Sequence, residues 1–140
     1  MVKVAEATVL CKSSKQKIVT KDSTEAELVA LSDMKNEVMK CWEFMVEQGY
    51  DLPPPKLFQD NKSTIALVKN DEGRYRNKYL RVRRALVKES IDNDEILVEF
   101  VPTHDMKADI FTKPLQGSLF FKMASGLLGS GEYPDATGVR

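Results

Sequence analysis

The stretch from Thr24 to Gln48 has the clearest helical pattern in this sequence. Its apolar residues recur at steps of three and four, which places them on one face of an α-helix. These residues are Leu28, Leu31, Met34, Val38, Cys41, Trp42 and Met45. Gly49 and the "DLPPP" stretch at 51–55 end the pattern, because proline lacks a backbone N–H. The sequence therefore predicts a long amphipathic helix whose apolar face packs on a core.

The segments around this helix predict strands that alternate with helices. Strand-like patterns occupy "VAEATVLC" (4–11), "KQKIVT" (15–20), "KLFQDN" (56–61) and "EILVEFVP" (95–102). Further helices are predicted over 62–70, 79–92, 104–113 and 117–129. The apolar positions of the helix at 79–92 are Leu80, Ala85, Leu86 and Ile91. We expect a mixed α/β domain over residues 1–128, with helices on both faces of its sheet, and a loose tail at 129–140.

The composition is that of an ordinary globular domain. A chain of 140 residues can bury one core without disulfides. No apolar run approaches the roughly 20 residues that span a bilayer, so no membrane partner is expected. Cys11 and Cys41 lack metal-type spacing and indicate a reduced compartment. With one histidine and no C-x-x-C pair, a structural zinc site is not expected.

The 21 basic and 21 acidic residues balance, but their distribution along the chain is uneven. Seven basic residues and no acidic residue lie between positions 74 and 88: Arg74, Arg76, Lys78, Arg81, Arg83, Arg84 and Lys88. Tyr75 and Tyr79 add flat rings that can stack on a base or sugar. The run predicts a nucleic-acid surface made by Arg74, Arg76, Lys78, Tyr79, Arg81 and Arg84. The alternative is a helix face that is simply solvated.

Three acidic residues lie where predicted elements begin or end. Glu27 is near the start of the long helix, Asp60 closes a strand, and Asp109 follows the last strand. Carboxylates that converge in this way suit magnesium, which prefers oxygen ligands. Each also has an ordinary alternative: Glu27 in a capping box with Thr24, Asp60 as a helix cap, and Asp109 as solvated surface.

Four blocks of the sequence, taken together and in order, resemble the ribonuclease H domain that ends copia-type retrotransposon polyproteins. The blocks are "SSKQKIVTKDSTEAELVALSD" (13–33), "QDNKSTIAL" (59–67), "YLRVRRALVKE" (79–89) and "VPTHDMKADIFTKPLQGSLF" (101–120). The resemblance covers about residues 11–128. It implies a five-stranded mixed sheet with helices on both sides, and cleavage of RNA in an RNA–DNA hybrid during reverse transcription. It also implies a site for two magnesium or manganese ions.

The resemblance assigns roles to individual residues. Glu27, Asp60 and Asp109 match the family's metal-binding carboxylates, while Glu25 is expected to favour the helix dipole only. Ser23 or Thr24 then supplies the capping hydroxyl of the long helix. His104 matches a loop histidine with a role in proton transfer or product release, and the alternative is a helix-start residue that makes hydrogen bonds.

The chain departs from the family at its beginning. The family's fourth carboxylate lies on a first strand that should precede "ATVLCKSSKQK", but only "MVKVAEA", with Glu6 as its one acid, comes before. We therefore expect the first strand to be missing and the neighbouring sheet edge to be unpaired. A chain without that aspartate is expected to be weakly active or inactive alone. Asp135 in the tail is a candidate substitute.

Three hypotheses follow from the residues and the resemblance. The first is a metal-dependent ribonuclease H-type domain acting on RNA–DNA hybrids. The second is a nucleic-acid-binding relic without catalysis, and the third is a structural module whose exposed sheet edge pairs with the reverse transcriptase of the same polyprotein. All three predict a location in a cytoplasmic retroelement particle or the nucleus.

Overall fold

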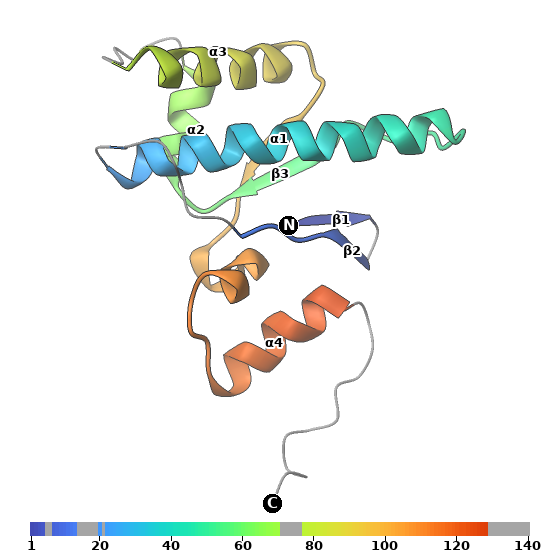
Figure 1. Ribbon diagram of the computed structural model, residues 1–140, viewed down its shortest axis with the longest axis vertical. Coiled ribbons are helices and arrows are strands. Elements are labelled where there is room, and N and C mark those ends of the chain that lie inside the picture. The colour runs from blue at the N-terminus through green and yellow to red at the C-terminus, as the bar shows by residue number, and fades with distance from the viewer. Residues whose placement is uncertain (5–6, 14–19, 21, 71–76, 129–140) are drawn as a thin grey trace, which may run out of the picture. The chain divides into compact units, whose positions relative to one another are not determined.

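The long helix predicted from the apolar periodicity is confirmed. It is α1, Ser23–Glu47, in the computed structural model (Figure 1). Asp22 caps it: the Asp22 Oδ1 atom accepts a hydrogen bond from the Glu25 backbone N–H at 2.9 Å. The prediction that Ser23 or Thr24 supplies the cap is therefore wrong by one or two residues, because the carboxylate before them already serves that N–H. Glu25 lies in the first turn, as expected for an acid that favours the helix dipole.

The structure describes residues 1–4, 7–13, 20, 22–70 and 77–128. They fall into two compact units. One unit is Gln16–His104, and the other combines Met1–Lys15 with Asp105–Arg140. The predicted strand at 15–20 lies outside the described residues except for its last position, and so does the predicted tail at 129–140.

The unit Gln16–His104 is a layer of helices on a short parallel sheet. Strands β3, Lys56–Gln59, and β4, Leu97–Phe100, pair in parallel with Leu57 opposite Val98. Helix α2, Lys62–Lys69, connects onward to α3, Lys78–Asp92, and α3 packs on both α1 and α2. The core consists of Leu28, Val29, Leu31, Leu57, Val68, Leu80, Val87, Ile96 and Val98. The predicted mixed α/β class is thus confirmed, with both strands and all three helices close to their predicted positions.

The sheet of this unit has one covered face. Leu57, Gln59 and Val98 are each 4% exposed, whereas Phe58 and Leu97, which point the other way, are 55% and 39% exposed. Alternation along each strand produces this division, because successive side chains point to opposite faces. Within the described residues the sheet has only these two strands.

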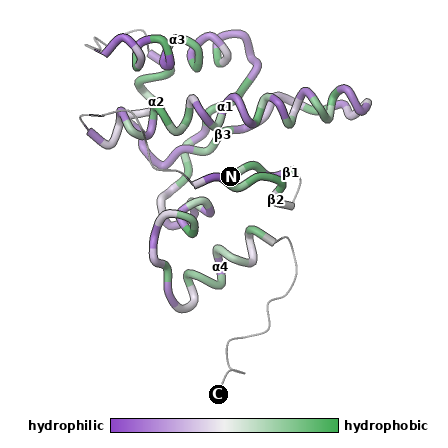
Figure 2. The backbone as a smooth tube through the Cα atoms, in the orientation of Figure 1, coloured by the Kyte–Doolittle hydropathy of each residue, from purple (hydrophilic) through white to green (hydrophobic). Residues whose placement is uncertain are grey.

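Helix α3 turns a different side to the core than the sequence predicted. Leu80 and Val87 are fully buried and Ile91 is partly buried, but Ala85 and Leu86 are exposed. The prediction for Ala85 and Leu86 was wrong because a basic helix with few apolar residues leaves its inner face ambiguous. In Figure 2 the tube of α3 alternates between hydrophilic and hydrophobic colours along its length.

The second unit combines a hairpin with a C-terminal helix. Strands β1, Val2–Val4, and β2, Ala7–Leu10, pair antiparallel, so the predicted single strand over 4–11 is in fact parts of two strands. Helix α4, Gly117–Leu128, packs against β2, and the Thr8 hydroxyl donates to the Leu127 carbonyl at 2.6 Å. The predicted helix at 104–113 is two 3₁₀ turns, η1 (Thr103–Asp105) and η2 (Lys107–Phe111). Met106 between them is extended, which interrupts the helix.

Candidate active site

Glu27 is held near the end of β3 by a buried amide. Gln59, the last residue of β3, is 4% exposed, and its Nε2 atom donates to Glu27 Oε2 at 3.3 Å. The Gln59 Oε1 atom accepts the Asn61 backbone N–H at 3.0 Å. Both ends of the Gln59 amide are thus satisfied, as a buried polar group requires. This Gln59 bridge, the hydrogen bond from Gln59 to Glu27, holds Glu27 on the second turn of α1 close to the C-terminal end of β3.

Asp60 lies in that same short connection and is half-buried. Its Oδ2 atom accepts a hydrogen bond from the Thr103 hydroxyl at 3.0 Å, which ties it to the segment after β4. The helix-cap alternative for Asp60 is wrong, because Asn61 is the cap of α2. The Asn61 Oδ1 atom accepts the backbone N–H groups of Ser63 at 2.9 Å and Thr64 at 3.1 Å. The Asp60 carboxylate therefore does not cap α2.

Asp109 lies in η2, within the other unit. Its side chain is 16% exposed and pairs with Lys113, with 2.5 Å between Asp109 Oδ2 and Lys113 Nζ. Asp109 is thus a partly exposed carboxylate in a local ion pair, and the solvated-surface alternative stays open. This pair lies one helical turn apart in sequence, so the lysine neutralises the carboxylate locally.

The donor set suits a hard cation. Within the described residues Glu27 and Asp60 each accept one side-chain hydrogen bond, and a carboxylate has about four lone-pair positions. Magnesium commonly binds through one or two carboxylates and keeps several waters. In the described part of the chain no group of three or more His, Cys, Asp or Glu side chains is arranged around a common point. A shared site for Glu27, Asp60 and Asp109 therefore stays a prediction, as does a role for exposed His104.

The basic residues of α3 form two groups: some are exposed to solvent, and others bind groups of the protein itself. Lys78, Arg81 and Tyr79 are exposed, and Tyr79 is 70% exposed. Among the residues that the structure describes, Lys78 and Arg81 make no ion pair. Arg74 and Arg76 lie outside those residues, as does Tyr75.

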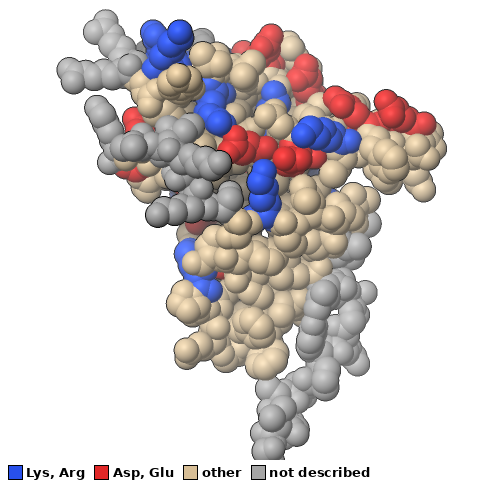
Figure 3. All heavy atoms as spheres, viewed as in Figure 1, with Lys and Arg blue, Asp and Glu red and all other residues tan. Residues whose placement is uncertain are grey.

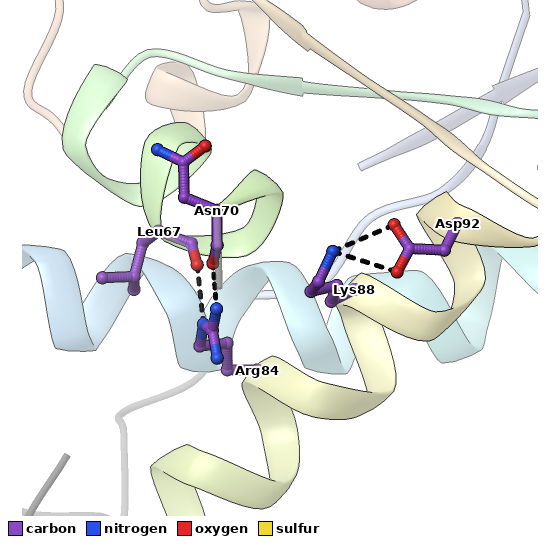
Figure 4. Close-up of polar contacts among 5 residues, drawn as sticks. All are labelled: Leu67, Asn70, Arg84, Lys88 and Asp92. Carbon is purple, nitrogen blue, oxygen red and sulfur yellow. Dashed lines mark hydrogen bonds and ion pairs between the residues drawn. The ribbon is translucent and has the colours of Figure 1, made fainter. Parts of the chain in front are cut away.

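Three other cations of the run bind to the protein itself. Arg83 pairs with Asp33 of α1, and Lys88 pairs with Asp92 at 3.0 Å between Nζ and Oδ2. Arg84 is half-buried, and its Nε atom donates to the Leu67 carbonyl at 2.7 Å while its Nη2 atom donates to the Asn70 carbonyl (Figure 4). Arg84 thus binds carbonyls at the end of α2, and we correct its assignment to a nucleic-acid surface.

The structural roles of Arg84 and Gln59 were not predicted, although the sequence contained a signal for each. Arg84 lies four residues after Leu80 and three before Val87, which places it on the buried side of α3. Gln59 lies two residues after Leu57 on a strand, so it shares the inward face. A polar residue at an inward position predicts a hydrogen-bonding role inside the protein.

The chain is similar to part of several transposon polyproteins. It is 32% identical over 114 residues, 81% of its length, to a retrovirus-related Pol polyprotein from transposon RE1 of Arabidopsis thaliana. It is 30% identical over 77% of its length to the Pol polyprotein from transposon TNT 1-94 of Nicotiana tabacum. It is 26% identical over 74% of its length to a truncated transposon Ty1-A Gag-Pol polyprotein of Saccharomyces cerevisiae.

These relatives are much longer proteins. The chain spans 8%, 8% and 9% of the lengths of these three. No protein-family model and no solved structure matches the chain. None of the described helices is long and apolar enough to cross a membrane. The chain is therefore homologous to a small part of retrotransposon Pol polyproteins.

The two arginines of α3 provide a test of these assignments. Arg84→Ala should lower the free energy of unfolding by about 1–3 kcal/mol, because two backbone carbonyls at the end of α2, one of them partly buried, lose a charged donor. Arg81→Ala, on the exposed side of the same helix, should change it by less than about 0.5 kcal/mol. Urea denaturation followed by circular dichroism measures both. Equal effects of the two substitutions would contradict the structural role of Arg84.

Proposed function

We propose that this chain is a ribonuclease H-type domain of a retroelement polyprotein, which hydrolyses RNA in RNA–DNA hybrids. The observation that carries the proposal is the Gln59 bridge. It ties Glu27 to Gln59, the residue directly before Asp60, and neither carboxylate caps a helix. The carboxyl end of parallel strands is where α/β proteins place their binding groups. Similarity to part of Pol polyproteins supports the retroelement origin of the domain.

Some of these residues are proposed to bind metal ions, and others are proposed to bind the substrate. Glu27, Asp60 and Asp109 would hold magnesium or manganese, which when bound activates a water and stabilises the leaving oxygen of the phosphodiester. Thr103 keeps the Asp60 carboxylate oriented through its hydroxyl, and Gln59 does the same for Glu27. His104, directly after Thr103, is proposed to move a proton or to assist product release.

Lys78, Tyr79 and Arg81 are proposed to contact the hybrid, together with Arg74 and Arg76. Cations on a helix neutralise phosphates, and an exposed tyrosine ring can stack. Such contacts read backbone and shape, so binding is expected to depend on salt more than on sequence. The reverse transcriptase region of the same polyprotein is a further proposed partner, because the relatives are longer polyproteins.

A second candidate is nucleic-acid binding without cleavage. It is favoured by the lack of a cluster of three carboxylates among the described residues. The exposed cations of α3 serve this function equally well. The two candidates differ in whether metal-dependent hydrolysis accompanies binding.

Cleavage of a labelled RNA–DNA hybrid tests the catalytic proposal. Cleavage should require magnesium or manganese and should fall by at least about 100-fold in Asp60→Asn, because the amide cannot replace an ionic ligand. Glu89→Gln, which removes an exposed carboxylate from α3, is the matched control and should leave the rate unchanged. Hybrid binding without any metal-dependent cleavage by the unmodified chain would favour the second candidate. Cleavage that survives Asp60→Asn would contradict the site.

Hybrid binding tests the exposed cations of α3. Arg81→Glu should weaken binding at low salt and make the slope of log K against log salt less steep by about 1, since each phosphate contact contributes about 0.9. Lys40→Glu reverses an exposed charge on α1 and is the control. Fluorescence anisotropy over a salt series measures both. If Arg81→Glu leaves the affinity and the slope unchanged, α3 is an ordinary solvated helix face.

A further inference from the structure

The solvent side of α3 carries a continuous apolar stripe. Tyr79, Val82 and Leu86 are 70%, 51% and 48% exposed. They follow one another at steps of three and four residues, so their side chains are neighbours on one face of the helix. Exposed apolar residues at this spacing are the pattern by which a helix docks on another protein surface. We call Tyr79, Val82 and Leu86 the α3 stripe.

The charges at the two ends of the α3 stripe do not suit the dipole of their own helix. Lys78 is the first residue of α3 and Glu89 begins its last turn, while the first turn has no acid and the last turn has no base. Both side chains are exposed, and neither makes an ion pair with any residue that the structure describes. A cation at a helix N-terminus and an anion at its C-terminus are both unfavourable. Lys78 and Glu89 therefore do not stabilise α3 by their position on it.

Lys78 and Glu89 lie on the same flank of the α3 stripe. They are about three helical turns apart, so they project in nearly the same direction, one at each end of the stripe. Figure 3 likewise shows both acidic and basic atoms, and not one sign alone, where Figure 1 draws α3 and α1. A partner surface with a single sign of charge would attract one of these residues and repel the other. The same flank turned end to end is complementary to itself.

From these observations we infer that α3 pairs with the α3 of a second copy of this chain, in antiparallel orientation. Two-fold symmetry then brings Lys78 of each copy close to Glu89 of the other. The two stripes meet face to face, with Tyr79 of one copy near Leu86 of the other and both Val82 side chains near the axis. Each Glu89 also lies beside the N-terminus of the facing helix, where the dipole favours an acid. Charges that are unfavourable within one helix are therefore favourable between two.

Pairing through α3 is separate from the proposed catalysis, because the Gln59 bridge and Asp60 belong to a single copy. The dimer covers Tyr79, whereas Arg81 projects from another side of α3 and stays open to nucleic acid. An interface of one helix per copy is small, so we expect a dissociation constant on the order of 10–100 μM. Hybrid binding and cleavage are measured on protein far more dilute than this, so they report on the monomer.

Charge reversal followed by analytical ultracentrifugation of the full chain at low salt tests the pairing. The unmodified chain should pass from monomer to dimer as its concentration rises through the expected range. Lys78→Glu and Glu89→Lys should each weaken association by at least about tenfold, because symmetry turns two attractive charge pairs into two repulsive ones. An equimolar mixture of the two variants should restore the dimer, and so should the chain that carries both substitutions. Both changes suit the α3 dipole, so circular dichroism should show an intact fold in the variants that dissociate.

A matched pair of truncations tests the apolar contact. Leu86→Ala should weaken association about tenfold, because symmetry removes two leucine side chains from the interface. Phe44→Ala removes an exposed aromatic side chain from α1 and should leave association unchanged.

Three results would overturn the inference. These are an unmodified chain that stays monomeric about tenfold above the expected range, single charge reversals that leave the dimer unchanged, and a mixture of the two variants that associates no better than its components. None of these measurements involves nucleic acid or metal, so their failure is distinguishable from failure of the catalytic proposal.

Discussion

Burial of one face of α1 is the constraint on which this part of the molecule depends. Leu28 and Leu31 are almost completely excluded from solvent, and they share a core with Leu57 of β3 and Leu80 and Val87 of α3. Glu27 immediately precedes Leu28, so the packing that buries the leucine also carries the carboxylate to β3. Gln59 then connects β3 to α1 through its hydrogen bond to Glu27, while its amide oxygen accepts the Asn61 backbone N–H. The site geometry is thus a consequence of how the helix packs on the sheet.

The helices and strands could be predicted where the apolar period is long and clean. Helix α1 and the strand before Asp60 were found within one or two residues, because periodicity and the flanking glycine and prolines agree. The 104–113 segment was less predictable, since short polar runs form 3₁₀ turns as readily as one helix. The hairpin was missed because alternation along 4–11 is the same for one strand and for parts of two.

The candidate site was predictable in its residue types but not in its supporting contacts. The placement of Glu27 and Asp60 next to element ends, together with the resemblance, selected two carboxylates that do not cap helices. Which residue caps each helix could not be read from the sequence, because Asp22, Ser23 and Thr24 are all good caps and so are Asp60 and Asn61. The contacts of the α3 cations could not be read from the sequence either. Charge alone does not reveal that Arg84 binds backbone carbonyls while Arg81 faces solvent.

The central claim is that Glu27 and Asp60 bind a divalent cation through the arrangement that Gln59 supports. A magnesium titration followed by ¹⁵N NMR tests it most directly, because the Gln59 side-chain NH₂ donates to Glu27 and reports on that carboxylate. The account predicts saturable shifts of the Gln59 side-chain and Asn61 backbone signals, and their loss in Asp60→Asn. Shifts that avoid both residues, or that persist unchanged in Asp60→Asn, would contradict it.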